Sequence, residues 1–286
     1  MNLSDQKVME LELIANDIRQ SIIDMLEDAG SGHTAGPLGM ADIFTAFYFH
    51  ILHHEPREPN WPDRDRLILS NGHIVPVRYA TMAHAGYFPI EELSTLRKFG
   101  SRLQGHPERH KLPGLETTSG PLGSGLSQSA GIAYGAQMDG KKFFTYCLMS
   151  DGEMQAGNIW EAAMFASAHK LGNLIGVIDR NNIQINGRTE DVMPIEPLAD
   201  KWRAFGWHVI EVDGHNIEEF VSAVGQAQAV THAPSIIIAY TIPGKGISEI
   251  EYDFKWHGTP PNKEQEEKWL KELRTLRGSI EASHHE

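Results

Sequence analysis

The stretch F143-F-T-Y-C-L-M-S-D-G-E-M-Q-A-G157 joins an apolar run to a cluster of oxygen-bearing side chains. About thirty residues later, a second apolar run at residues 174–178 ends in D179-R-N-N182. Continuous apolar runs of this length are typical of strands buried on both faces of a sheet. A strand–helix–strand crossover takes roughly 30 residues, which is also the separation of Asp151 and Asn181. If the two runs are neighbouring parallel strands, these side chains end up side by side.

The rest of the chain repeats this alternation of strand-like and helix-like segments. Short runs of apolar and β-branched residues predict strands at residues 66–70, 143–149, 174–178, 208–212 and 235–241. Between them, amphipathic patterns predict helices at residues 40–52, 75–85, 126–138, 159–171 and 217–229. The alternation predicts an α/β, doubly wound fold, in which a mainly parallel sheet carries helices on both faces.

The sequence shows no sign of a domain boundary. No low-complexity linker or internal repeat interrupts the sequence, so residues 1–286 are expected to form a single domain. A charged segment near the C-terminus, at about 262–277, has helical propensity. An exposed arm, a packing helix and a partner contact are all compatible with this segment.

The composition of the chain argues against several classes of partner. The net charge of −13 argues against a nucleic-acid partner, because such proteins normally display a basic face. No apolar run approaches the roughly 18 residues of a membrane-spanning helix, so no membrane association is expected. The N-terminus shows an amphipathic helical pattern rather than a secretory signal, and the single cysteine, Cys147, lies inside an apolar run. These two features favour a reducing cytoplasm.

Two interpretations of Asp151 and Asn181 remain open at this point. A carboxylate, an amide oxygen and a nearby backbone carbonyl would make a hard-oxygen site of the kind that magnesium or calcium prefers. Alternatively, Asp-Gly and Asn-Asn are ordinary turn sequences. The crossover spacing and the position of both groups at carboxyl ends of predicted strands favour a shared site.

A glycine-rich segment, T117-T-S-G-P-L-G-S-G-L126, leads directly into a predicted helix. Glycines allow close approach of a ligand, and the free N–H groups at a helix start favour an anion. The segment fits the dinucleotide fingerprint poorly and no P-loop occurs in the chain. A phosphate-binding loop and a simple helix-starting turn are both compatible with it.

Four histidines lie among glycines or prolines rather than in charged helices, and glycine neighbours would let both the imidazole and the backbone reach a ligand. Each could equally be a loop histidine bonded to a backbone carbonyl, but four similar settings favour a shared role. They occur in S31-G-H-T-A-G-P-L-G39, L69-S-N-G-H73, Q104-G-H-P-E108 and W256-H-G258.

With these segments, the sequence resembles transketolase, specifically its N-terminal, diphosphate-binding domain, over nearly the whole chain. The resemblance is carried by the four histidine segments, the glycine-rich segment, S150-D-G-E153 with N181-N-I183, and Pro243-Gly-Lys-Gly-Ile247. Several motifs in the same order make it specific. It implies the thiamine diphosphate-binding fold, with thiamine diphosphate and Mg²⁺ as cofactors and Ca²⁺ or Mn²⁺ as possible metal substitutes.

The resemblance implies particular cofactor and metal contacts. Asp151, the Asn181 side chain and the backbone carbonyl of Ile183 resemble the metal ligands, while Gly152 and Asn181 resemble residues against the diphosphate. The loop at Gly120, Pro121 and Leu122 is similar to the backbone that holds the aminopyrimidine end of the cofactor.

The resemblance also assigns roles to the four histidines. His73 and His257 match residues near the diphosphate and the reacting centre. His33 and His257 resemble the pair that contacts hydroxyls of the donor sugar, and His106 resembles the residue near its C1 hydroxyl and carbonyl. Imidazoles that titrate near neutrality suit a reaction in which hydroxyl protons move at each stage.

A complete transketolase-like chain is more than twice as long as this one. The resemblance therefore implies the N-terminal subunit of a split transketolase, which transfers a two-carbon ketol unit from a ketose (phosphate) to an aldose (phosphate). A separate pyrimidine-binding subunit would complete the site, and two copies of each chain are expected. Alternatives are a subunit of another thiamine diphosphate enzyme, such as a specialised ketose transketolase or a 2-oxo acid dehydrogenase α chain, and a non-catalytic partner-binding relative.

The sequence departs from the family pattern in two places. Ser150 precedes Asp151 where the family often has glycine, a change expected to be tolerated. Ala156 stands where the family commonly has an acid, in Q155-A-G157. That acid is thought to link the two active sites of the dimer, so the departure puts proton linkage between the sites in doubt. Glu153 lies three residues too early to replace it directly.

Overall fold

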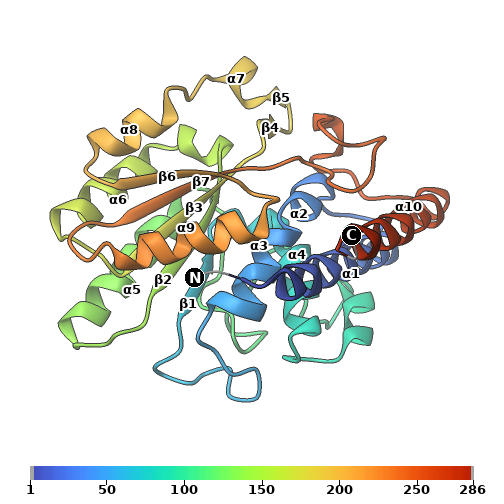
Figure 1. The fold of residues 1–286 in the computed structure, drawn as a ribbon, viewed down its shortest axis with the longest axis horizontal. Coiled ribbons are helices and arrows are strands. Elements are labelled where there is room, and N and C mark those ends of the chain that lie inside the picture. The colour runs from blue at the N-terminus through green and yellow to red at the C-terminus, as the bar shows by residue number, and fades with distance from the viewer. Residues whose placement is uncertain (1–2, 285–286) are drawn as a thin grey trace.

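A five-stranded parallel sheet forms the centre of the molecule in the computed structural model, which describes residues 3–284 (Figure 1). The spatial order of the strands is β1-β2-β3-β7-β6, and every neighbouring pair in this sheet is parallel. The strands are β1 (Arg66–Leu69), β2 (Thr145–Ser150), β3 (Leu174–Arg180), β6 (His208–Asp213) and β7 (Ser235–Tyr240). All five predicted strands are confirmed, and β2 and β3 are neighbours, as their crossover spacing predicted.

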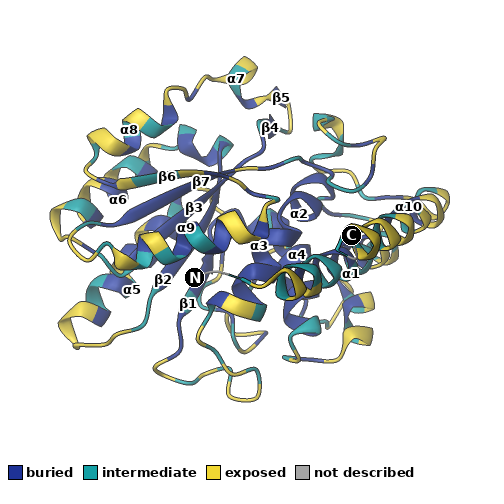
Figure 2. Ribbon diagram, in the orientation of Figure 1, coloured by how far each residue is buried: buried dark blue, intermediate teal, exposed yellow. Residues whose placement is uncertain are grey.

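Helices cover both faces of the sheet, which confirms the doubly wound fold (Figures 1 and 2). One face carries α1 (Asp5–Ala29), α3 (Ala41–Ala46), α4 (Val75–His84) and α9 (Ile217–Ala229). The other face carries α5 (Ser124–Met138), α6 (Gly157–Ala168) and α8 (Leu198–Ala204).

The side chains of each buried strand alternate between the two helical layers. Successive side chains of a strand point to opposite faces. In β2, Tyr146 and Leu148 pack into the core under α1, α3, α4 and α9, whereas Cys147 and Met149 pack into the core under α5 and α6. Because both faces are covered, the strand needs no polar alternation, and this explains why its sequence is continuously apolar.

The predicted helix at residues 40–52 is not one continuous α-helix. It divides into α3 and a π-helical turn at Phe47–Ile51, closed by a hydrogen bond from Leu52 N–H to the Phe47 carbonyl (2.8 Å). Phe47 packs edge-on against Tyr146 and Phe220, at ring-centroid distances of 5.0 and 5.5 Å. The aromatic packing is consistent with a wider turn that periodicity alone could not predict.

The C-terminal segment forms α10 (Lys263–Ser283), which packs along α1 (Figure 1). The prediction of a helix at about 262–277 is confirmed, and the helix extends further. Trp269 and Leu273 are fully buried, and Asn16 of α1 donates a hydrogen bond to the Leu273 carbonyl (2.8 Å). Of the three interpretations considered for this segment, the structure supports a packing helix.

Several short elements were not predicted. They are α2 (Ala35–Gly39), β4 (Ile183–Gln184), β5 (Gly187–Arg188), α7 (Thr189–Val192), α8 and 3-10 turns at Gly72–Ile74, Ile90–Thr95, Gly152–Gln155 and Phe254–Trp256. The antiparallel pair β4–β5 directly follows β3 and extends its carboxyl end.

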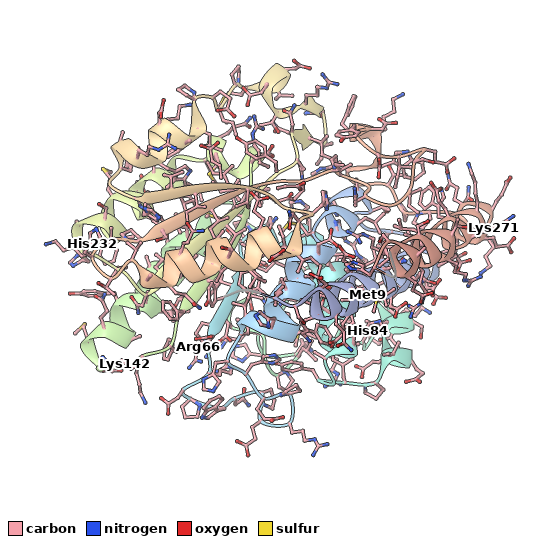
Figure 3. The ribbon with its side chains drawn as sticks, in the orientation of Figure 1. Met9, Arg66, His84, Lys142, His232 and Lys271 are labelled. Carbon is pink, nitrogen blue, oxygen red and sulfur yellow. The ribbon has the colours of Figure 1, made fainter. Side chains whose placement is uncertain are left out.

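Many polar and charged side chains lie at the periphery of the fold. Lys142, His232 and Lys271, labelled in Figure 3, project outward from three separate regions. Across residues 3–284, none of the helices combines the length and the hydropathy needed to cross a membrane.

Candidate active site

A cavity of about 390 Å³ opens at the carboxyl edge of the parallel sheet. In doubly wound folds this edge is where ligands bind, because the loops that follow the strands converge there. Most of the predicted site residues line it together, although they are spread from residue 33 to residue 257. The lining consists of His33, His73, His106, Gly120, Leu122, Ser150, Gly152, Ile183, Gln184, Ile185, Asn186 and His257.

Each lining histidine lies in a loop. His73 follows β1 in a 3-10 turn, and His33 precedes α2. His106 lies in the long connection before α5, and His257 follows a 3-10 turn beyond β7. Loops positioned by a rigid sheet are a common source of functional side chains. The structure thus brings together all four histidines that the sequence singled out.

Three of the imidazoles contact one another. The ring centroids of His33 and His73 are 4.8 Å apart, those of His33 and His257 5.3 Å, and those of His73 and His257 5.2 Å. Burial is the main reason that the pKa of His33 falls to about 4, and the neighbouring charges of His257, Arg97 and His106 add to it. Burial likewise lowers the pKa values of His73, His106 and His257. The cluster is therefore neutral at pH 7.

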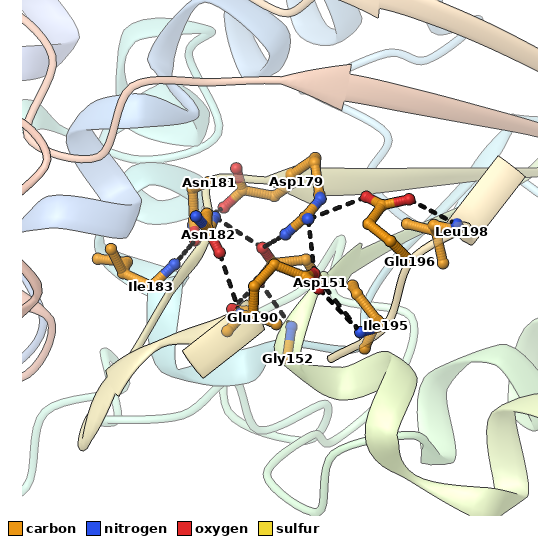
Figure 4. Close-up of polar contacts among 12 residues, drawn as sticks. Asp151, Gly152, Asp179, Asn181, Asn182, Ile183, Glu190, Ile195, Glu196 and Leu198 are labelled. Carbon is orange, nitrogen blue, oxygen red and sulfur yellow. Dashed lines mark hydrogen bonds and ion pairs between the residues drawn. The ribbon is translucent and has the colours of Figure 1, made fainter. Parts of the chain in front are cut away.

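The carboxylate of Asp151 lies fully buried at the end of β2, where four groups donate hydrogen bonds to it (Figure 4). Its Oδ1 accepts from Gly152 N–H (2.6 Å) and the Thr189 hydroxyl (3.2 Å). Its Oδ2 accepts from the Arg180 guanidinium (2.8 Å) and Asn182 N–H (2.6 Å). Burial raises the pKa of Asp151, and the Arg180 charge opposes that rise.

Asn181 lies at the neighbouring strand end, held between β3 and the β4 backbone. Its Nδ2 donates to Asp179 (2.7 Å), and its Oδ1 accepts from Ile183 N–H (3.0 Å) (Figure 4). Asp179 also accepts a hydrogen bond from the Thr241 hydroxyl, and burial raises its pKa to about 7. This second buried acid orients the Asn181 amide.

These residues fit a magnesium ion by the chemistry of their donors. Among residues 3–284 no group of three His, Cys, Asp or Glu side chains is placed to hold a metal. Magnesium does not need one, since it typically takes one or two carboxylates and completes its shell with phosphate and water. Asp151 and the Asn181 side-chain oxygen supply hard oxygen ligands, as does any backbone carbonyl. The Arg180 guanidinium and a metal ion would compete for the Asp151 carboxylate.

The cavity also has unsatisfied polar groups that suit a polar ligand. Nδ1 of His33, Nδ1 of His257 and Nε2 of Gln184 are buried and have no hydrogen-bond partner among the described residues. Buried polar atoms are normally paired, so such atoms in a cavity wall indicate where a ligand binds. Gly152 adds to the opening, because a Cβ at this position would occupy the space next to the Gln184 side chain, at ordinary van der Waals distance from it.

Sequence reasoning missed three side chains of this region. Arg180 makes ion pairs with Asp151 (2.8 Å), Glu190 (2.7 Å) and Glu196 (2.9 Å), and so connects the segment after β5 to the end of β2. Thr189 adds a hydroxyl to Asp151. Glu153 is buried below the glycine-rich loop. Their only signal in the sequence is proximity to the two strand ends.

Ala156, the second departure from the family pattern, lies half-buried immediately before α6. Its N–H donates a hydrogen bond to the Glu153 carbonyl (3.0 Å). The methyl group offers no acid at this position.

The fold and this site define an α/β protein that binds its ligand in loops at the carboxyl edge of a parallel sheet. Comparison with known proteins identifies the group. The family described as transketolase, thiamine diphosphate-binding domain, matches residues 11–277. The chain belongs to this family, which binds thiamine diphosphate.

Two curated relatives match the chain over almost their full length. The 6-deoxy-6-sulfo-D-fructose transketolase subunit of Clostridium sp. (strain MSTE9) is 44% identical, over 93% of this chain and 96% of the relative. An apulose-4-phosphate transketolase subunit of Phocaeicola vulgatus is 40% identical, over 93% of this chain and 95% of the relative. The chain is thus similar to nearly the whole of both subunits.

A solved structure agrees with this assignment. Transketolase from Campylobacter jejuni superimposes with a TM-score of 0.87 at 35% identity, over 97% of this chain and 43% of that protein. The chain corresponds to less than half of such a full-length transketolase.

Proposed function

We propose that this protein is the N-terminal subunit of a two-chain transketolase that transfers a ketol unit from a ketose to an aldose. The observation that carries the proposal is the cavity itself. It gathers four histidines beside a buried carboxylate–amide pair, in a chain that is similar to two transketolase subunits over nearly their full length. Residues 1–286 would act as one diphosphate-binding domain, since both cores are built on the same sheet.

Thiamine diphosphate, when bound, supplies the carbon nucleophile and electron sink by which a carbon–carbon bond is broken and formed. We propose that Asp151, Asn181 and the Ile183 carbonyl hold its magnesium ion. Gly152 and Asn181 would lie against the diphosphate, where the lack of a side chain on Gly152 permits close approach. The backbone at Gly120, Pro121 and Leu122 would hold the aminopyrimidine end.

The histidines would bind the sugar and move its hydroxyl protons. An imidazole whose pKa lies below 7 is a proton acceptor at neutral pH, so His33 and His257 can accept hydrogen bonds from donor-sugar hydroxyls. We assign His106 to the C1 hydroxyl and His73 to the diphosphate side of the reacting centre. Contact between the rings would let a proton taken up at one affect the next.

A second, pyrimidine-binding chain would complete the site. Exposed apolar side chains surround the cavity mouth and the adjacent hairpin, and such patches are typical of protein interfaces. They are Leu122, Ile185, Val192 and Met193. We propose an assembly of two copies of each chain, and a cytoplasmic location consistent with one buried cysteine.

The substrates would be sugar phosphates or other anionic sugars. The names of the two relatives specify 6-deoxy-6-sulfo-D-fructose and apulose 4-phosphate, a sulfonated and a phosphorylated sugar. Phosphate-binding residues would lie on the partner chain, so the donor of this enzyme is best found with a panel that includes sugars of the pentose phosphate pathway.

Reconstitution tests the proposal. The purified chain, its candidate partner, thiamine diphosphate and Mg²⁺ should together transfer two carbons from xylulose 5-phosphate, or another ketose of the panel, to ribose 5-phosphate. Neither chain alone should do so. Cofactor binding without transfer from any ketose would contradict the assignment and favour a non-catalytic relative.

A further inference from the structure

The carboxylate of Glu153 accepts hydrogen bonds from three different segments at the carboxyl edge of the sheet. Its donors are the Ser70 hydroxyl just after β1, Gly123 N–H in the glycine-rich loop and Ser150 N–H at the end of β2 (3.2 Å). The side chain is only 1% exposed. A buried carboxylate is costly unless it is hydrogen-bonded, and here these three donors offset that cost.

Ser70 extends this hydrogen-bond network to a second residue of the glycine-rich segment. Its Oγ donates to Glu153 and accepts from Gly125 N–H (3.1 Å). Gly125 lies so close to Ser70 that a Cβ at this position would overlap it. Gly123 has a φ of 85°, and a Cβ there would overlap the Asn158 side chain. The loop is therefore packed at both glycines and has little freedom to move.

This loop forms the cavity wall on one side. Gly120 and Leu122 line the cavity, and α5 begins at Ser124 directly after the turn. Two N–H groups of the loop, those of Gly123 and Gly125, are fixed by Glu153 and Ser70 rather than by secondary structure. We call Glu153 and Ser70 the loop clamp.

We propose that Glu153 is a positioning residue for cofactor binding, which sets the backbone of the glycine-rich loop through Gly123 and, by way of Ser70, through Gly125. The inference rests on the proposed function and concerns the same site. Glu153 does not itself line the cavity, so it would act through the loop. A carboxylate suits the role because all three partners donate and a carboxylate only accepts. Glutamine would turn an amide N–H towards one of these donors.

Binding and turnover of the Glu153→Gln variant in the assembled enzyme test the clamp. We expect the Kd for thiamine diphosphate with Mg²⁺ to rise about tenfold or more, the size expected for disturbing a buried charged hydrogen-bond network. At saturating cofactor, kcat should change much less than the apparent KM for the cofactor. A role in stability alone would lower the melting temperature and leave that KM unchanged. Glu218→Gln, an exposed acid on α9, is the matched control.

Amide exchange and a double-mutant cycle add readouts that do not depend on activity. The Gly123 and Gly125 amides should exchange faster in Glu153→Gln, while those of β3 stay protected. Ser70→Ala should weaken cofactor binding in the same direction, and adding it to Glu153→Gln should weaken binding less than additively. Ser70→Ala also carries the test if Glu153→Gln does not fold.

The outcomes separate the two proposals. A wild-type assembly that binds no thiamine diphosphate would overturn both the proposed function and the clamp. Wild-type binding with unchanged Kd in Glu153→Gln and Ser70→Ala would overturn the clamp alone.

Discussion

At the scale of single residues, His33 combines burial with a position in the cavity wall. Its pKa in the folded protein is about 4, below the 6.5 of an ordinary histidine. Between these two values the unfolded chain binds a proton more readily than the folded one. The free energy of unfolding should therefore fall as the pH is lowered from 6.5 towards 4, by up to about 3 kcal/mol from this group.

Urea unfolding at pH 7 and at pH 5 measures this effect. His33→Asn removes the titrating group, so the variant should lose less stability between these pH values than the wild type does. An equal decrease in the free energy of unfolding in both proteins would show that the pKa of His33 is not lowered in the folded state.

Asp151 allows a sharper test of the metal site. Asp151→Ala removes one proposed magnesium ligand and leaves Arg180 paired with Glu190 and Glu196, so a folded variant is expected. Magnesium-dependent binding of thiamine diphosphate should weaken at least about 100-fold. Calorimetry with and without Mg²⁺ measures it, and Asp191→Ala on exposed α7 is the control. Unchanged binding would place the metal elsewhere.

At the scale of elements, α10 contributes to stability through a narrow buried stripe. Leu273 is fully buried against α1, so Leu273→Ala should lower the free energy of unfolding by about 2–5 kcal/mol. Lys271→Ala, exposed on the same helix, should change it by less than about 0.5 kcal/mol. Denaturant titration compares the two. Similar small effects would mean that α10 is not integral to the core.

The elements that the sequence predicted well are those with a simple burial pattern. The five parallel strands are buried on both faces and read as apolar runs, and α9 has the predicted bounds, 217–229. The elements of the segment 183–197 were not predicted because they are too short for a periodic pattern, namely two strands of two residues each and a single helical turn. Contacts such as the Arg180–Asp151 ion pair hold this region in place. The candidate site was predicted from residue types at strand ends and from the family resemblance, and the structure places most of these residues around one cavity. The groups that donate hydrogen bonds to the Asp151 carboxylate could not be predicted, because they depend on side-chain directions that sequence spacing does not determine.

At the scale of the whole molecule, the exposed apolar rim predicts where the partner binds. Met193 is 50% exposed next to the hairpin β4–β5. Met193→Glu should weaken assembly with the pyrimidine-binding chain about tenfold or more and leave the fold of the free chain intact. Light scattering of the mixed chains measures it. Lys142→Glu, at the opposite edge of the sheet, should assemble normally. Normal assembly of Met193→Glu would move the interface away from this rim.

The four cavity imidazoles all project from loops, whereas the sheet that carries those loops is a packed apolar core. Mutations in such loops alter what is recognised without disturbing the core beneath, because loops tolerate change that packed interiors do not. Mutations in these loops can thus change which sugar is preferred at little cost in the free energy of unfolding. For a protein engineer, residues 184–186 offer promising positions for new specificity, since they line the cavity, belong to a short hairpin outside the main sheet and carry no proposed metal ligand.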